Sequence, residues 1–230
     1  MPKRSPPETA APLIPDSPTL DKLREAARGC QACPLWKTGT QTVFGEPQSR
    51  SARGGLRVMF VGEQPGDQQD RAGRPFVGPS GKLLDDALQS VGIDRGQVYV
   101  TNAVKHFKWV AQGKRRLHQK PNAREIAACK PWLEAEIQVL APDVIVALGA
   151  TAAQALLGKD FRVSQSRGEL NPSAYAQVVI ATVHPSSILR APDEQARRQA
   201  YAAFLDDLRV VAHVLRRLGA GEGADARPGV

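Results

Sequence analysis

The sequence predicts an α/β fold in which helices cover both faces of a parallel β-sheet. Two observations lead to this prediction. Four short apolar segments are continuous rather than alternating, which is typical of strands buried on both faces. Segments with helical spacing separate them, and parallel strands need such crossover connections. With 230 residues the chain is long enough to bury a substantial core.

The expected elements follow in chain order. The predicted strands cover residues 56–62, 97–105, 143–148 and 177–183. The predicted helices cover residues 80–91 with Ser80 as N-cap, 122–140 with Asn122 as N-cap and a kink or break at Pro131, 151–157, and 192–218. Residues 1–17 and 220–230 are expected to be disordered tails because of their composition. Residues 18–219 are then expected to form one domain.

The composition narrows the class of partner and the compartment. A net charge of +8 favours a polyanion such as nucleic acid, although a merely basic soluble protein would have the same charge. The odd count of three cysteines, two of them in a CxxC pair, argues against a secreted disulfide framework, so we expect a reducing cytoplasm. We expect no membrane partner, because no apolar run reaches spanning length.

Polar residues follow each predicted strand. Ligands of parallel sheets bind at the carboxyl ends of the strands, so a site is predicted there. These residues are Glu63 and Gln64, Asn102 to His106, Gly149, and His184 to Ser186. The glycines of GEQPG (62–66) form neither a dinucleotide-binding nor a P-loop motif. The alternative for Glu63 is a solvated side chain in an ordinary strand-to-helix turn.

Three further motifs have a functional and a structural interpretation. Phe76 lies in a Gly/Pro loop, where it could stack on a planar ring or fill the edge of the core. The segment GKRRLH (113–118) is basic and ends in His118; such charge runs are usually solvated. His184 begins HPSSILR (184–190), from which it could reach a bound ring or phosphate.

Four residues are candidate metal ligands. The pair Cys30 and Cys33 suits a soft metal or an iron–sulfur cluster, and Cys129 and His106 could complete the set. A structural zinc site with three thiolates and one imidazole is equally consistent with these residues. The alternative without metal is a hydrogen-bonded His106 and a core Cys129.

Taken together, these motifs resemble the uracil-DNA glycosylase superfamily over about residues 30–217. The matching segments are GEQPG, RPFVGPSG (74–81), TNAVK (101–105) and HPSSILR, and the cysteines resemble those of its iron–sulfur branch. That branch usually has a fourth cysteine where this chain has His106, and it lacks the GKRRLH segment. Both departures resemble the X type of the family, although Leu117 replaces an isoleucine of its motif.

The resemblance implies a three-layer α/β/α sandwich around a four-stranded parallel sheet, and an enzyme that excises uracil from single- or double-stranded DNA. It implies a [4Fe–4S] cluster held by Cys30, Cys33, His106 and Cys129. The X type also implies covalent attachment of the protein to C1′ of the abasic site after a single turnover. We expect a monomer that acts on the nucleoid in a bacterial cytoplasm.

The resemblance also implies residue roles. Phe76 would stack on uracil, Asn102 would read its Watson–Crick edge, and backbone groups of Gln64 and Gly66 would hold it. His184 would stabilise the leaving uracil anion, while Glu63 would orient or deprotonate His118 for attack at C1′. Lys114, Arg115 and Arg116 would contact phosphate and hold their loop, and Ser186 and Arg190 would contact DNA. The alternatives are an ordinary multiple-turnover glycosylase and a non-catalytic metal-containing DNA-binding module.

Overall fold

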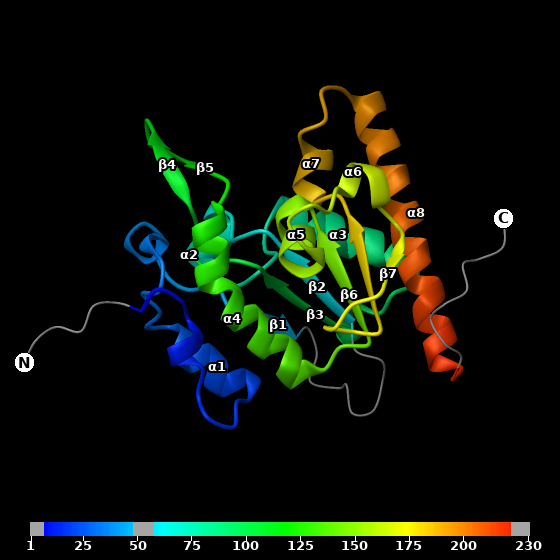
Figure 1. Ribbon diagram of the computed structural model, residues 1–230. Coiled ribbons are helices and arrows are strands. Elements are labelled where there is room, and N and C mark those ends of the chain that lie inside the picture. Colours follow the sequence, from blue (N-terminus) through cyan, green and yellow to red (C-terminus); the bar gives the residue numbers. More distant parts are fainter. Residues whose placement is uncertain (1–6, 48–57, 222–230) are drawn as a thin grey trace, which may run out of the picture.

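The computed structural model describes residues 7–47 and 58–221 and has a mostly parallel sheet between two layers of helices (Figure 1). Its four central strands are β2 (Val58–Gly62), β3 (Val98–Asn102), β6 (Val144–Leu148) and β8 (Val178–Thr182). They are parallel, in the order β3-β2-β6-β8, and every residue in them is buried. This confirms the predicted α/β sandwich and explains the continuous apolar runs.

Two short strands that the sequence did not predict complete the sheet. β1 (Glu46–Pro47) pairs antiparallel with β3, and β7 (Leu170–Asn171) pairs antiparallel with β8. Each is two residues long, and the sheet order is β1-β3-β2-β6-β8-β7. Short edge strands of this kind limit the number of unpaired backbone N–H and C=O groups with which another chain could pair.

The first helical layer consists of α3 (Pro79–Ser90), α7 (Pro185–Leu189) and α8 (Glu194–Gly219), which lie together on one face of the sheet (Figure 1). Phe60 from β2 packs in one apolar cluster with Leu84 of α3 and Phe204 of α8. The predicted cap of α3 is wrong. Gly78, with φ +93°, occupies the N-cap position, and α3 begins at Pro79, a favoured first residue.

The second layer consists of α4 (Ala123–Leu140), α5 (Ala150–Leu157) and α6 (Val163–Ser166). Asn122 caps α4 as predicted, in a reciprocal capping box with Glu125. α4 continues through Pro131, so the predicted break is wrong. Trp132 and Leu133 are buried directly after the proline, and their packing holds the helix together there.

An N-terminal segment packs on the far side of α4, where it forms a third apolar cluster. It contains the short turns η1 (Ala11–Leu13) and η2 (Pro34–Lys37) and helix α1 (Leu20–Ala27). The expected disorder of residues 1–17 is therefore wrong for residues 7–17: Ala10 is fully buried, and its N–H donates to the Ala128 carbonyl at 2.9 Å. Residues 1–6, 222–230 and the first two residues of the strand expected at 56–62 lie outside the described residues.

The basic segment expected to be a loop is instead a β-hairpin, which projects from the body in Figure 1. It consists of β4 (Trp109–Gln112) and β5 (Arg115–His118), joined by Gly113 and Lys114. Gly113 has φ +58°, as the first position of a type II′ turn requires. Helix α2 (Asp67–Ala72) and the turn η3 (Arg95–Gln97) complete the elements. None of the helices in the described residues is long and apolar enough to span a membrane.

Candidate active site

A cavity of about 660 Å³ opens at the carboxyl ends of the central strands. Its lining comes from the turn after β2, the end of β5, the end of β6 with the start of α5, and α7 with the turn before it, together with single residues or pairs from α2, α3 and α6. The predicted site residues that line it are Glu63, Gln64, Gly66, His118, His184, Ser186 and Arg190. Positions far apart in sequence therefore meet where the parallel topology predicts a site.

Glu63 and His118 form the polar centre of this cavity. His118 Nε2 lies 3.2 Å from Glu63 Oε1, and the Thr151 hydroxyl donates to Oε2 of the same carboxylate. Burial raises the pKa of Glu63, but the hydrogen bonds from His118 and Thr151 outweigh it, so the pKa lies below its ordinary value. The carboxylate is therefore ionised at neutral pH and can orient the imidazole or accept its proton.

His184 is a neutral imidazole with a defined tautomer. Burial lowers its pKa to about 4, although the Glu63 charge acts in the opposite direction. Its Nδ1 accepts the Ser186 backbone N–H at 3.1 Å, so the ring proton is on Nε2. At neutral pH His184 can therefore donate one hydrogen bond from Nε2.

Asn102 and Phe76 both lie next to Gly62 at the end of β2, although neither is among the residues that line the cavity. The Asn102 side chain is buried, yet its Nδ2 has no hydrogen-bond partner among the described residues. A buried amide donor without a partner is costly, which points to a ligand acceptor at this position. The Phe76 ring is nearly parallel to the His184 ring, at an interplanar angle of 25° and a centroid distance of 6.0 Å.

Two glycines allow this arrangement. A Cβ on Gly62 would lie 2.4 Å from Asn102 Oδ1 and 2.9 Å from the Phe76 ring, so only glycine leaves room for both side chains. A Cβ on Gly81 would overlap the Phe76 carbonyl, which α3 approaches at its first turn. Phe76 itself has φ +54°, an uncommon conformation for an aromatic residue.

The Gln64 side chain holds the hairpin in place. Its Nε2 donates to the carbonyls of Lys108 and Gln119, and its Oε1 accepts the Lys108 N–H, at 3.0–3.2 Å. Lys108 and Gln119 flank the hairpin, one on each side. The side chain is therefore occupied, which leaves only backbone groups for the base-holding role that the resemblance implies.

The three basic residues of the hairpin differ in their surroundings. The Arg116 side chain is 13 % exposed and forms ion pairs with Asp67 and Asp70. Its guanidinium also lies over the rings of Phe107 and Trp109. Arg116 thus fixes the hairpin to α2 and is not free for phosphate. Lys114 and Arg115 are exposed at the turn and have no ion-pair partner among the described residues.

The candidate cluster ligands are all buried beside α4. Cys30, Cys33 and Cys129 belong to the third apolar cluster, and His106 is 5 % exposed just past β3. Two N–H groups point at the sulfurs: the Trp132 indole lies 3.3 Å from Cys30 Sγ, and the Lys105 backbone nitrogen lies 3.2 Å from Cys129 Sγ. The three cysteines form no disulfide.

The chemistry of this donor set fits an iron–sulfur cluster. Burial raises the pKa of Cys129 to about 12, so binding iron requires the loss of a tightly held proton. Burial lowers the pKa of His106 to about 4, so the imidazole is neutral and able to bind a metal. Within residues 7–47 and 58–221, no three His, Cys, Asp or Glu side chains are placed to hold a single metal ion.

Comparison with known proteins identifies the family. A family model of the uracil DNA glycosylase superfamily matches residues 50–209. The chain belongs to this superfamily. It is 38 % identical over 180 residues to a type-4 uracil-DNA glycosylase of Pyrobaculum aerophilum, covering 75 % of this chain and 86 % of the relative. It is 36 % identical over 201 residues to a type-4 uracil-DNA glycosylase of Thermotoga maritima, covering 87 % and 96 %.

The superfamily membership predicted from the motifs is thus confirmed, whereas the X type stays a prediction. Several residues in or next to the candidate site were not predicted from the sequence. Thr151 binds the Glu63 carboxylate, and Ser80 and Gln69 line the cavity. Asp70 is fully buried and accepts from the Thr40 N–H and from Arg116. No local pattern marks these residues, because their roles depend on partners distant in sequence.

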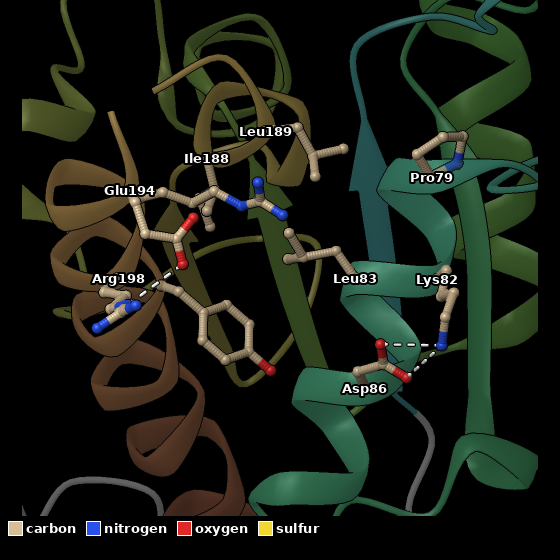
Figure 2. Close-up of a pocket in the computed structure, with 10 residues that line it drawn as sticks. Pro79, Lys82, Leu83, Asp86, Ile188, Leu189, Glu194 and Arg198 are labelled. Carbon is tan, nitrogen blue, oxygen red and sulfur yellow. Dashed lines mark hydrogen bonds and ion pairs between the residues drawn. The ribbon is translucent and has the colours of Figure 1, made fainter. Parts of the chain in front are cut away.

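A second hollow of about 490 Å³ lies between α3, α7 and α8 (Figure 2). Its labelled charges pair with each other, Lys82 with Asp86 at 3.1 Å and Arg198 with Glu194 at 3.3 Å. Its lining includes none of the buried polar atoms without partners found among the described residues. The cavity beside β2 and β8 is therefore the better candidate site.

Proposed function

We propose that this protein excises uracil from DNA by cleaving the bond between uracil N1 and C1′ of deoxyuridine. The main support is the buried Asn102 amide, which has no partner among the described residues and lies next to Gly62. The neutral His184 and the ionised Glu63 line the cavity that begins directly after Gly62. The names of the type-4 relatives support the same substrate. The cavity can accept a nucleotide only when it is outside the base stack, so the base must be flipped or come from single-stranded DNA.

The residues around Asn102 suit recognition of uracil. Uracil O4 accepts a hydrogen bond where cytosine carries a donating amino group, so Asn102 Nδ2 distinguishes the two bases. Phe76 offers a ring face for stacking. His184 donates from Nε2 to uracil O2, where negative charge develops as the glycosidic bond breaks. His184 suits this role because the Ser186 N–H fixes its tautomer, so the Nε2 proton is in place before the reaction.

Uracil release from labelled single-stranded oligonucleotides tests this activity. We expect release from a uracil-containing strand and none from the matched cytosine strand. Asn102→Ala should lose excision while DNA binding largely persists, because the lost contact is to the base and not to phosphate. If the wild-type protein binds the strand but releases no uracil, the proposed activity is wrong and the non-catalytic DNA-binding module is favoured.

We further propose that His118 becomes bonded to C1′ of the deoxyribose from which uracil has been removed. His118 ends β5 at the cavity, with its side chain 48 % exposed, and the Glu63 carboxylate contacts Nε2. The hairpin that carries it is anchored by Gln64 and Arg116. His118 is thus a nucleophile on an anchored strand, and the Glu63 carboxylate orients its ring, which suits attack at C1′.

The covalent step replaces the N1–C1′ bond with a bond from C1′ to His118. The N1–C1′ bond breaks with its electron pair on uracil, and an imidazole nitrogen of His118 forms a bond to C1′ with its lone pair. The imidazole N–H proton passes to Glu63 and then to solvent, and the uracil anion takes a proton from solvent. The product is a protein–DNA adduct and free uracil. An ordinary multiple-turnover glycosylase would instead add water at C1′ and release an abasic strand.

We also propose that Cys30, Cys33, His106 and Cys129 hold a [4Fe–4S] cluster. Three buried thiols, one neutral imidazole and two N–H groups directed at sulfur support it. When bound, the cluster would tie the N-terminal segment to α4 and to the end of β3, next to Asn102. Purified protein should be brown and contain iron and sulfide, and colourless protein with one zinc would show that the assignment is wrong.

A further inference from the structure

The hairpin carries the only two large apolar side chains that are well exposed among the described residues. Val110 is 47 % exposed and Leu117 is 46 % exposed. They are register partners across β4 and β5, so their side chains lie side by side on one face of the hairpin. Single exposed apolar residues are common on protein surfaces, but a paired set on a projecting element indicates an interaction surface. We call Val110 and Leu117 the apolar pair.

The exposure of the apolar pair does not come from a loose loop. The opposite face of the hairpin is engaged with the body through Trp109, Arg116 and His118. The Trp109 indole donates to the Thr38 carbonyl at 2.8 Å, Arg116 binds Asp70, and His118 contacts Glu63. The hairpin is thus fixed in one orientation, with the apolar pair turned outward.

The surroundings of the apolar pair indicate its partner. Leu117 lines the active-site cavity and Val110 does not, so the pair extends outward from the edge of the site. Lys114 and Arg115 are exposed at the adjoining turn, and neither has an ion-pair partner among the described residues. Apolar contact next to unpaired cations matches a single-stranded nucleic acid, which offers base faces and phosphates together.

We propose that the apolar pair is a platform for the base next to the nucleotide in the cavity, on single-stranded DNA. This inference rests on the proposed function, because that function places a flipped nucleotide beside Leu117. Apolar side chains contact nucleobases where the bases have lost their stacking neighbours. A base in an intact duplex is already stacked and gains little, so the platform favours unpaired strands, with Lys114 and Arg115 beside the adjoining phosphates.

The test compares two single-stranded oligonucleotides. Both carry 2′-fluoro-deoxyuridine, whose electron-withdrawing fluorine makes the glycosidic bond resistant to cleavage, and one of them lacks the bases on either side of it. Affinity is measured by fluorescence anisotropy for the wild-type protein and for Val110→Ser/Leu117→Ser. The matched control is Val110→Ile/Leu117→Ile, which keeps both positions apolar. Uracil release from an ordinary uracil strand is measured separately.

We expect the wild-type protein to prefer the strand with neighbouring bases by about tenfold, which corresponds to ~1.4 kcal/mol. The double serine variant should lose most of this preference, and the isoleucine control should keep it. An unchanged preference in the serine variant would overturn the inference, and so would a wild-type dimer that the serine substitutions convert to a monomer. Absence of uracil release would count against the proposed function alone, because the affinity comparison does not depend on cleavage.

Discussion

Replacing Glu136 by Gln should destabilise the fold strongly, because it leaves a buried ammonium group without its counter-charge. The Lys105 and Glu136 side chains are 1 % and 0 % exposed and form an ion pair beside β3. The carboxylate also accepts from the Tyr99 hydroxyl at 2.7 Å and from the Gly45 N–H at 3.0 Å. Burial and the Glu136 charge raise the pKa of Tyr99 well above its ordinary value, so its hydroxyl remains a donor.

The expected loss follows from this burial. Breaking a fully buried ion pair by removing one partner costs roughly 3–5 kcal/mol in the free energy of unfolding. For a domain of this size each kcal/mol lowers the melting temperature by about 2–4 °C, so Glu136→Gln should lower it by about 6–20 °C. The ammonium group also donates to the Asn102 carbonyl at 2.7 Å, so the loss should spread to Asn102, the residue proposed to read the base.

Thermal unfolding followed by circular dichroism measures this effect. The matched control is Glu194→Gln, because the Glu194 and Arg198 side chains are 67 % and 78 % exposed and such a pair contributes no more than about 1 kcal/mol. Lys105→Met/Glu136→Leu should recover part of the loss, since it removes both charges but leaves the Tyr99 and Gly45 donors unpaired. If Glu136→Gln melts at the same temperature as Glu194→Gln, the reasoning about the buried charge is refuted.

Three further predictions concern the site and the cluster. Gly62→Ala should abolish uracil release while the fold is retained, because the new methyl displaces Asn102 or Phe76; release at the wild-type rate would contradict this. The pKa of His184 is about 4 in the folded protein and about 6.5 in the unfolded chain, so the free energy of unfolding should fall as the pH drops from about 6.5 to 4. In urea unfolding measured across this pH range, His184→Asn should lose less of its free energy of unfolding than the wild-type protein does. His106→Cys should keep its iron and sulfide by elemental analysis, because thiolate is the commoner ligand; loss of iron would show that a thiolate cannot replace the imidazole at this position.

The sequence allowed the sheet and the location of the site to be predicted, because both depend on strong local patterns. The strand Val144–Leu148 is buried at every residue, and its continuous apolar sequence distinguishes it from a half-exposed strand with alternating residues. Residues that follow such parallel strands meet at one edge of the sheet. The hairpin was missed because nearly all of its residues are exposed, so no alternation of buried and exposed residues marks its two strands. The glycine at the first position of a two-residue turn was the available signal.

Other features could not be predicted from local sequence. The burial of Ala10 depends on the Ala128 carbonyl more than a hundred residues away, and composition alone favours disorder for that segment. The attachment of Arg116 to Asp67 and Asp70 is likewise a tertiary contact, so a basic run read in isolation looks like a phosphate-binding surface. The continuation of α4 through Pro131 shows packing overriding a residue's intrinsic preference.

The most direct test of covalent attachment is the intact mass of the protein, measured under denaturing conditions after native incubation with a uracil-containing single strand. For the wild-type protein we expect a species with the mass of protein plus oligonucleotide minus uracil. We expect no such species for His118→Ser, which should still release uracil and leave an abasic strand. Unmodified wild-type protein together with released uracil would contradict covalent attachment and establish the ordinary multiple-turnover reaction. An adduct that persists in His118→Ser would show that another residue is the nucleophile.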